Sequence, residues 1–176
     1  MKTTGVVRRI DELGRIVIPK EIRKNLRINE GENIEIYVDE DNVVLKKFSV
    51  LNKINEYADK IVDSVNFFIK KNIIITDNDK VIAASGKLKN EFLDKQISKT
   101  LIDYIKNRKT IIESKDSKLN LVDDLSVDAA YCLTNIIVEG DSAGLIIILS
   151  SDVKVDSFDM IICQMMARFL SKILED

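Results

Sequence analysis

Basic side chains concentrate near the start of the chain and could bind an anionic partner. Residues 1–27 hold eight basic and three acidic side chains, although the whole chain has a formal net charge of −2. Such a surface is most often simply solvated, and its alternative use is contact with the phosphates of a nucleic acid. Four of the cations follow the spacing i, i+3, i+4 and i+7, which places them on one helix face: Lys20, Arg23, Lys24 and Arg27.

Three arginines on neighbouring segments favour the nucleic-acid interpretation. Arg8, Arg9 and Arg15 have little acid near them in the sequence, and a homodimer would double the basic surface. Arginine can also bind the edges of guanine in the major groove. We therefore predict double-stranded DNA as a partner, with these DNA-binding residues: Arg8, Arg9, Arg15, Lys20, Arg23 and Lys24.

Catalytic and metal chemistry has little support in the sequence. Histidine is absent, which removes Ser-His-Asp triads, Cys-His nucleophiles and His-ligated zinc. The two cysteines are too few for a metal cluster and lie in apolar stretches. Two carboxylate pairs, Asp77 with Asp79 and Asp123 with Asp124, fall in predicted turns, where aspartate is favoured for backbone reasons. We therefore expect no enzyme activity, no metal and no cofactor.

Five aromatic side chains after residue 60 have two interpretations. They can line a ligand pocket between a sheet and its helices, or they can pack in an ordinary core, which is the commoner situation. The residues concerned are Phe67, Phe68, Phe92, Tyr104 and Tyr131.

The elements that would carry the early cations are short. About fifty residues bury too little surface to be stable alone, so this part of the chain should complete its core with a second copy. Alternation of apolar and polar residues, turn residues and Pro19 predict the following order: strands at Gly5–Ile10 and Arg15–Ile18, a helix from Pro19 to about Arg27, and a hairpin of Ile34–Val38 with Val43–Phe48.

From Leu51 onward the pattern becomes that of an α+β domain. Leu51, Ile54, Ala58, Ile61 and Val65 recur at spacings of 3, 4, 3 and 4. That spacing suits either a linker helix packing on another helix or a helix covering its own sheet. Further on we predict a hairpin of Ile73–Asp77 with Lys80–Ala84, a helix at Asn90–Lys109, a short strand near Ile111, a hairpin of Ala130–Val138 with a central strand Ala143–Ser150, and a helix at Asp156–Leu174 with surplus apolar surface.

The first segment is specific enough to resemble a family. The nineteen residues from Gly5 to Arg23 closely resemble the N-terminal DNA-binding domain of the AbrB-like transition-state regulators, and the resemblance continues to about Lys47. It implies a homodimeric swapped-hairpin barrel in which the cations matching Arg8, Arg15, Arg23 and Lys24 contact DNA. At position 24 this chain has lysine where arginine is also common in the family, so a bidentate contact is not expected there.

The remainder, including the stretch Ile75–Gly86, is similar to a GAF-like sensor domain found in a sporulation regulator of the same family. The combined resemblance implies an N-terminal swapped-hairpin β-barrel, dimeric and with a short helix, followed by a C-terminal α+β GAF-like domain. The expected domains are residues 1–50, a linker helix at 51–66, and a sensor or oligomerisation domain at 67–176.

The implied function is a transcription regulator that activates and represses sporulation genes. Its targets would be AT-rich, loosely specified DNA, and it would form a homodimer through the first domain and a homotetramer overall. The GAF-like domain could bind a small molecule. The longest apolar run, Ala143–Leu149, has seven residues, too short for a membrane span. We expect a cytoplasmic, nucleoid-associated protein with no membrane partner.

A second hypothesis comes from another functional class. Swapped-hairpin domains also occur in toxin–antitoxin modules, so the chain could be an antitoxin-like or scaffolding protein. Antitoxins usually end in a disordered tail that clasps the toxin, whereas some 125 residues with predicted hairpins and helices follow the first domain here.

Overall fold

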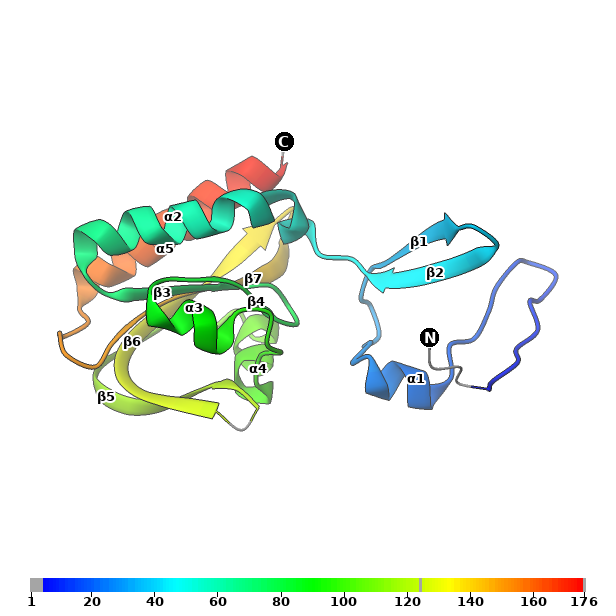
Figure 1. Ribbon diagram of the computed structural model, residues 1–176, viewed down its shortest axis with the longest axis horizontal. Coiled ribbons are helices and arrows are strands. Elements are labelled where there is room, and N and C mark those ends of the chain that lie inside the picture. The colour runs from blue at the N-terminus through cyan, green and yellow to red at the C-terminus, as the bar shows by residue number, and fades with distance from the viewer. Residues whose placement is uncertain (1–4, 124, 176) are drawn as a thin grey trace. The chain divides into compact units, whose positions relative to one another are not determined.

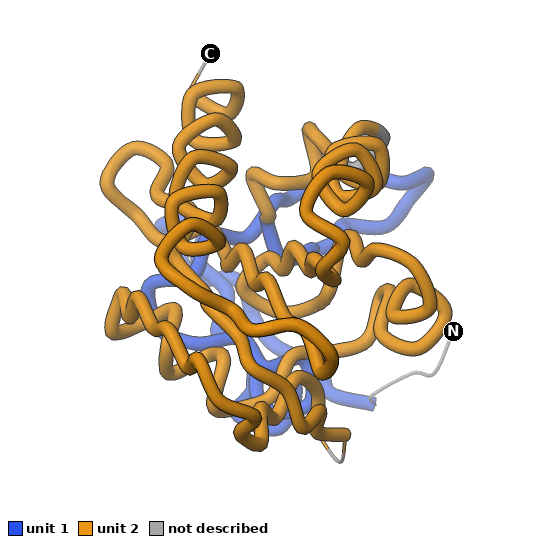
Figure 2. Tube along the Cα trace, turned by 90° about the vertical axis from the view of Figure 1, so that its left-hand side faces the viewer, with its two compact units in different colours: residues 1–48 blue, residues 49–176 orange. Residues whose placement is uncertain are grey.

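The computed structural model describes residues 5–123 and 125–175. The chain divides into two compact units (Figure 2), which we call unit 1, residues 1–48, and unit 2, residues 49–176.

Unit 1 holds one short helix and one hairpin. The helix α1, Lys20–Asn25, begins directly after Pro19, whose fixed φ suits a helix start. It ends two residues before the predicted end, because Arg27 adopts a left-handed conformation with φ 51°. The predicted hairpin is confirmed as β1, Ile34–Asp39, paired antiparallel with β2, Asn42–Lys47.

The two strands predicted at Gly5–Ile10 and Arg15–Ile18 are not present. Residues 5–18 contain no strand, and only the turn between the two segments is formed, with Asp11 N donating to Arg15 O at 3.1 Å. A strand needs a hydrogen-bonded neighbour and cover for its apolar face. The described part of unit 1 supplies neither, and Val7 and Val17 are 92% and 74% exposed.

Unit 2 is built on a five-stranded antiparallel sheet with the order β4-β3-β7-β6-β5 (Figure 1). β7 lies in the middle of the sheet, as its apolar sequence predicted, and all but its first two residues are buried. The strands are β3 at Asn72–Thr76, β4 at Val81–Ala84, β5 at Ile111–Val122, β6 at Leu125–Val138 and β7 at Asp141–Ser150.

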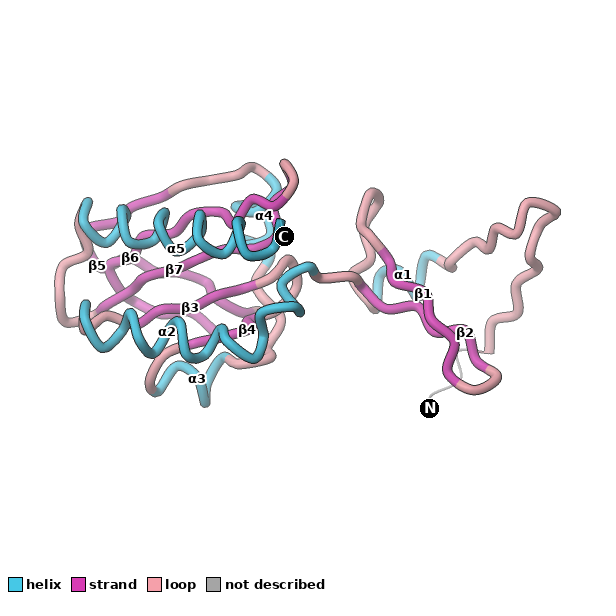
Figure 3. The backbone as a smooth tube through the Cα atoms, turned by 90° about the horizontal axis from the view of Figure 1, so that it is seen from above, coloured by secondary structure: helices cyan, strands magenta, loops and turns pink. Residues whose placement is uncertain are grey.

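Helices cover both faces of this sheet (Figure 1), and Figure 3 looks down on the face that α2 and α5 cover. Side chains alternate along β7, so Ile146 and Ile148 face one core and Ile147 faces the other. The first face carries a 3₁₀ turn, η1, at Val50–Ile54, then α2 at Asn55–Ile69 and α5 at Ser157–Glu175. The opposite face carries α3 at Lys87–Phe92 and α4 at Lys99–Lys106. No helix among the described residues is long and apolar enough to cross a membrane.

The heptad-like residues after Leu51 cover the sheet of their own unit. Leu51, Ile54 and Ala58 are buried in the core shared by η1, α2, α5 and the sheet, and Ile61 and Val65 pack against it. Of the two interpretations of this spacing, the structure therefore shows the second.

The single helix predicted at Asn90–Lys109 is wrong, because the segment forms two helices with an extended turn between them. Asp94 takes a left-handed conformation, and its N–H bonds to Val81 O at 2.9 Å, which attaches the turn to the edge of the sheet. Ser98 then caps α4, its Oγ accepting a hydrogen bond from Leu101 N at 3.2 Å. These bonds replace the helical bonds that the apolar spacing suggested.

β5 is longer than predicted, and β6 begins five residues before the predicted Ala130. β5 is an edge strand of twelve residues, most of which are exposed. Its pairing with β6 shifts register between Glu113 and Ser117, which interrupts the alternation that identifies a strand in sequence.

Candidate nucleic-acid interface

All six predicted DNA-binding residues are exposed on unit 1. Lys20, Arg23 and Lys24 lie on α1, which buries none of its own side chains. Arg8, Arg9 and Arg15 lie on the extended segments on either side of the turn at residues 11–14. The side chains are therefore free of the core and open to a large anionic partner, as DNA-phosphate contacts require.

The fourth cation of the helical stripe, Arg27, differs from the rest. It is half-buried and follows the end of α1. Its carbonyl oxygen accepts hydrogen bonds from Lys47 Nζ and Asn29 Nδ2, both at 3.2 Å. Lys47 Nζ also lies 3.5 Å from Glu32 Oε2. The backbone of Arg27 thus ties the end of α1 to β2 and fixes the direction of the helix within unit 1.

Asp11 organises the turn that carries Arg15. Its Oδ1 accepts hydrogen bonds from Leu13 N at 3.0 Å and Arg15 N at 2.8 Å, and its Oδ2 accepts one from Arg15 Nε at 2.7 Å. The hydrogen bond from the Arg15 backbone, followed by the one from its guanidinium, lowers the pKa of the Asp11 carboxyl below its ordinary value. Sequence reasoning predicted a turn at residues 11–14, but it missed the contact of Asp11 with the Arg15 side chain.

Unit 1 has no closed core of its own. Among residues 5–48 only Pro19 is buried. The exposed side chains form a surplus of apolar surface far above what a small soluble unit normally leaves in water: Val6, Val7, Ile10, Leu13, Ile16, Val17, Leu26, Ile36, Tyr37, Val38, Val43, Leu45 and Phe48.

A second apolar surface lies on unit 2. Five side chains on one stripe of α5 are between 41% and 63% exposed: Phe158, Ile161, Met165, Phe169 and Ile173. Beside them a groove of about 580 Å³ runs between α2 and α5, with Phe68 and Met165 among the residues that line it. The surplus predicted for the last helix is therefore present and uncovered in the described chain.

Of the two interpretations of the five aromatic residues, core packing holds for three. Phe92 and Tyr131 are buried in the apolar cluster between the sheet and helices α3 and α4, and Tyr104 packs against it. Phe67 and Phe68 lie on the surface of α2, with their rings 5.4 Å apart. The five residues therefore do not gather around one cavity.

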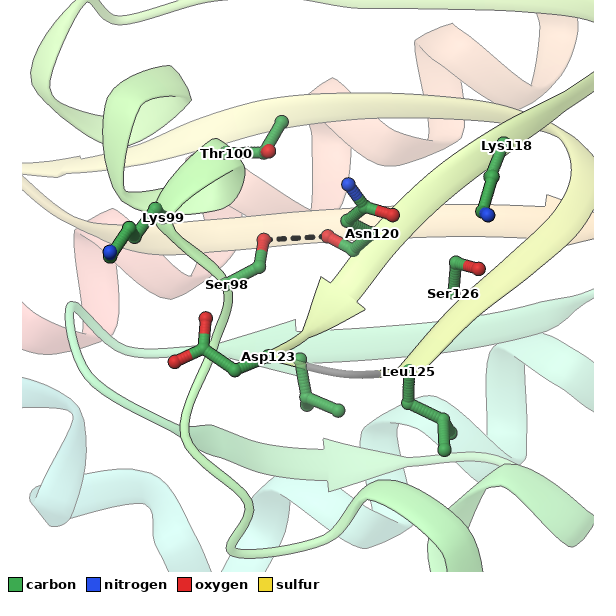
Figure 4. Close-up of a pocket in the computed structure, with 9 residues that line it drawn as sticks. Ser98, Lys99, Thr100, Lys118, Asn120, Asp123, Leu125 and Ser126 are labelled. Carbon is green, nitrogen blue, oxygen red and sulfur yellow. Dashed lines mark hydrogen bonds between the residues drawn. The ribbon is translucent and has the colours of Figure 1, made fainter.

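A polar depression of about 590 Å³ lies between the start of α4 and the strands β5 and β6. Figure 4 shows Ser98, Lys99 and Thr100 at the start of α4 and Lys118 and Asn120 on β5, all around the same space. Ser98 Oγ donates to Asn120 O at 2.7 Å, which fixes α4 against β5. The depression offers cationic and hydroxyl groups to a small polar molecule.

The carboxylate pairs have structural roles where they are described. Asp77 Oδ1 accepts hydrogen bonds from the backbone N–H groups of Asp79 and Lys80, both at 2.7 Å, so it closes the β3–β4 turn. Asp123 borders the polar depression, and Asp124 lies outside the described residues. Across residues 5–123 and 125–175 no group of three His, Cys, Asp or Glu side chains is placed to hold a metal ion.

Comparison with known proteins gives two family matches. Residues 53–175 match the family described as Stage V sporulation protein T C-terminal, transcription factor. Residues 7–48 match the family described as Antidote-toxin recognition MazE, bacterial antitoxin.

Three individual proteins place these matches in context. The chain is 38% identical over 177 residues to stage V sporulation protein T of Bacillus subtilis (strain 168), covering 99% of each chain. It is 55% identical to the solved N-terminal DNA recognition domain of the Bacillus subtilis transition-state regulator AbrB, covering 28% of this chain and 92% of that one, with a TM-score of 0.25. The solved cofactor-binding GAF domain of the nutrient sensor CodY from Clostridium difficile is 11% identical, covering 69% of this chain and 90% of that one, with a TM-score of 0.48.

The full-length match joins both units in one relative, in the same order along the chain. The family match over residues 53–175 covers most of unit 2, including the whole sheet and α5. This protein therefore belongs to the stage V sporulation protein T family of transcription factors.

Proposed function

We propose that this protein regulates the transcription of sporulation genes by binding double-stranded DNA through unit 1, both as an activator and as a repressor. It acts in the cytoplasm, in association with the nucleoid. The observation that carries the proposal is the set of six exposed cations on unit 1, in a chain whose family consists of transcription factors. Exposed cations that release counterions from phosphates supply most of the affinity of such proteins for DNA.

The DNA-binding form is a dimer through unit 1. The segments 5–10 and 15–18 form no strand and pair with no strand of the described chain, and most of their apolar side chains are exposed. A second copy would supply both the missing strand neighbours and the missing apolar cover, giving the swapped-hairpin barrel. The cations of both copies would then contact one duplex, and AT-rich sequences would be favoured through their shape, because A-tracts have a narrow minor groove and TA steps bend easily.

Unit 2 joins two such dimers into a tetramer and acts as a GAF-like sensor. The exposed stripe of α5 and the neighbouring groove supply the apolar surface for that second contact. A small polar ligand would occupy the depression at the start of α4, and it would change DNA affinity only by binding one conformation of the protein better than another.

The DNA-binding proposal is tested by the salt dependence of affinity. If Arg23 and Lys24 contact phosphates, replacing either with alanine should make the slope of log affinity against log salt shallower by about 0.9 per contact, or about 1.8 per dimer. Lys106→Ala is the matched control, because Lys106 is an exposed cation at the end of a helix of unit 2. Unchanged slopes for folded Arg23→Ala and Lys24→Ala dimers, with a loss for Lys106→Ala, would refute the proposal.

An antitoxin function is the second candidate, favoured by the family match of residues 7–48. It would require a stoichiometric protein partner for the chain. Copurification of such a partner, together with the absence of DNA affinity at low salt, would establish this candidate over the first.

A further inference from the structure

The two carboxylate oxygens of Asp11 have separate partners. Oδ1 accepts the backbone N–H groups of Leu13 and Arg15, and Gly14 N donates to Asp11 O at 3.0 Å, so Oδ1 and the backbone close the turn. Oδ2 takes no part in the turn and accepts the Nε–H of Arg15 at 2.7 Å. One oxygen therefore shapes the backbone, and the other holds the side chain.

The contact to Nε leaves the end of the Arg15 guanidinium available. The Arg15 side chain is 73% exposed, and among residues 5–123 and 125–175 the structure records no partner for its Nη1 and Nη2 atoms. The N–H groups of these two atoms form a planar fork that suits bidentate contact with a guanine edge or a phosphate. A guanidinium held at Nε keeps this fork in one orientation, whereas a free arginine samples many.

We propose that Asp11 is a positioning residue for DNA recognition, which holds Arg15 through Nε so that the Nη fork meets the duplex in a fixed direction. The inference rests on the proposed DNA contact of Arg15. It assigns sequence discrimination, rather than affinity, to an acidic residue within the most basic part of the chain.

The proposal can be tested by removing the negative charge of Asp11, because a bystander acid and a positioning acid predict different changes in DNA binding. Asp11 is ionised at neutral pH, since its pKa is lowered from an ordinary value that is already acidic. It therefore places a negative charge next to a cation that contacts DNA. A bystander acid at that place only weakens the attraction to phosphates, and its removal should tighten binding to every duplex. A positioning acid should behave differently, because its removal frees Arg15 and lowers the preference for the correct duplex.

Asp11→Asn separates the two roles of the side chain. The amide oxygen can still accept the N–H groups of Leu13 and Arg15, so the turn is preserved. The Nδ2 group would face Arg15 Nε as a second donor, so the positioning contact is lost. The probes are one duplex selected by the parent protein from a random-sequence library and a shuffled duplex of the same composition. We expect the ratio of the two affinities to fall about tenfold in Asp11→Asn.

Glu12→Gln is the matched control. Glu12 is the neighbouring acid in the same turn and is exposed, and none of the recorded hydrogen bonds or ion pairs involves its side chain. Its replacement should tighten binding to both duplexes alike and leave their ratio unchanged. If Asp11→Asn behaves like Glu12→Gln, the positioning role is refuted.

Arg15 variants show whether Asp11 acts through this arginine. In an Arg15→Ala background, Asp11→Asn should no longer lower the ratio, and a loss as large as in the parent would refute the proposal. Arg15→Lys keeps the charge but lacks the fork, so it should by itself lower the ratio of the affinities for the selected and shuffled duplexes. This variant tests the proposal even if Asp11→Asn does not fold. If Arg15→Ala binds both duplexes like the parent, the DNA contact of Arg15 fails first, and the positioning role fails with it.

Discussion

Lys71 Nζ lies 2.6 Å from Asp159 Oδ2, and the two side chains are only 10% and 1% exposed. Lys71 follows the end of α2, and Asp159 lies in the first turn of α5. Asp159 Oδ2 also accepts Asp156 N at 2.9 Å, so the same oxygen fixes the entry into α5. This pair therefore sets the relative position of the two helices whose outer surfaces carry the exposed apolar side chains of unit 2.

Breaking the pair should destabilise unit 2. Lys71→Met leaves the Asp159 carboxylate buried without its cation, and we expect the free energy of unfolding to fall by about 3–5 kcal/mol. Urea unfolding of the full chain followed by far-UV circular dichroism measures this. Lys172→Met is the control, because it breaks the exposed pair between Lys172 and Glu175, and it should change little. Equal effects of the two variants would contradict the prediction.

Gly144→Ala, in the middle of the sheet, should lower the free energy of unfolding more than Gly140→Ala, which lies in a turn. A Cβ at position 144 would lie 1.9 Å from Thr76 O, a backbone atom of the neighbouring strand that cannot turn aside. We expect a loss of about 3 kcal/mol or more in thermal or urea unfolding.

Gly140→Ala is the comparison for that variant. Gly140 has φ 88° and open space around it, so alanine there meets only backbone strain, about 1–2 kcal/mol. If Gly144→Ala is the milder of the two changes, the close approach of β7 to β3 is not the reason for the glycine.

A charge on the α5 stripe should change the mass of the assembly without unfolding the chain. Met165 and Phe169 are 62% and 54% exposed, so replacing either with glutamate removes little from the core of one chain. We expect sedimentation equilibrium to show dimers in place of tetramers, with the melting temperature of unit 2 lowered only by the lost association. Arg168→Glu, at an exposed polar position of the same helix, should retain the parent mass. If all three variants keep the tetramer mass of the parent, this stripe is excluded as an interface.

The two thiols should react only after unfolding. Burial, and then the hydrogen bond with the Cys132 thiol, raises the pKa of Cys163 well above its ordinary value, so the reactive thiolate is scarce. Cys163 Sγ also donates to Ile146 O at 3.3 Å, and both thiols are fully buried. At pH 8 a thiol reagent such as dithionitrobenzoate should label neither residue in the native protein and both in urea. Rapid labelling of the native protein would contradict this placement.

The sequence predicted those elements that have a strong local signal. The β3–β4 hairpin, central β7 and α5 follow from apolar periodicity and from turn residues such as Asp77 and Gly140. The helix break at Asp94 was not predictable in this way, because it depends on hydrogen bonds to Val81, a residue of another strand. Only a short strand near Ile111 was predicted, and the full length of β5 was missed for a related reason, since its register shift interrupts the alternation.

The candidate interface was predicted as a set of cations but not as an arrangement. Charge and helical spacing identify Arg23 and Lys24, and the structure places them exposed on α1. The role of Asp11 depends on which carboxylate oxygen meets which donor, and residue types alone do not contain that information. The strands expected at residues 5–18 need a hydrogen-bonded neighbour that the described residues of one copy do not supply, so a local pattern cannot decide whether they form.

Pro19 is the one buried residue among residues 5–48. This near-absence of a core has a consequence for how gene control would respond to protein supply. If unit 1 acquires its core only in pairs, the concentration of DNA-competent protein rises with the square of the monomer concentration when monomers are scarce. Doubling the amount of chain would then raise promoter occupancy about fourfold in that range. Target genes would keep their unregulated state at low expression and change state over a narrow interval of synthesis, without any separate signal.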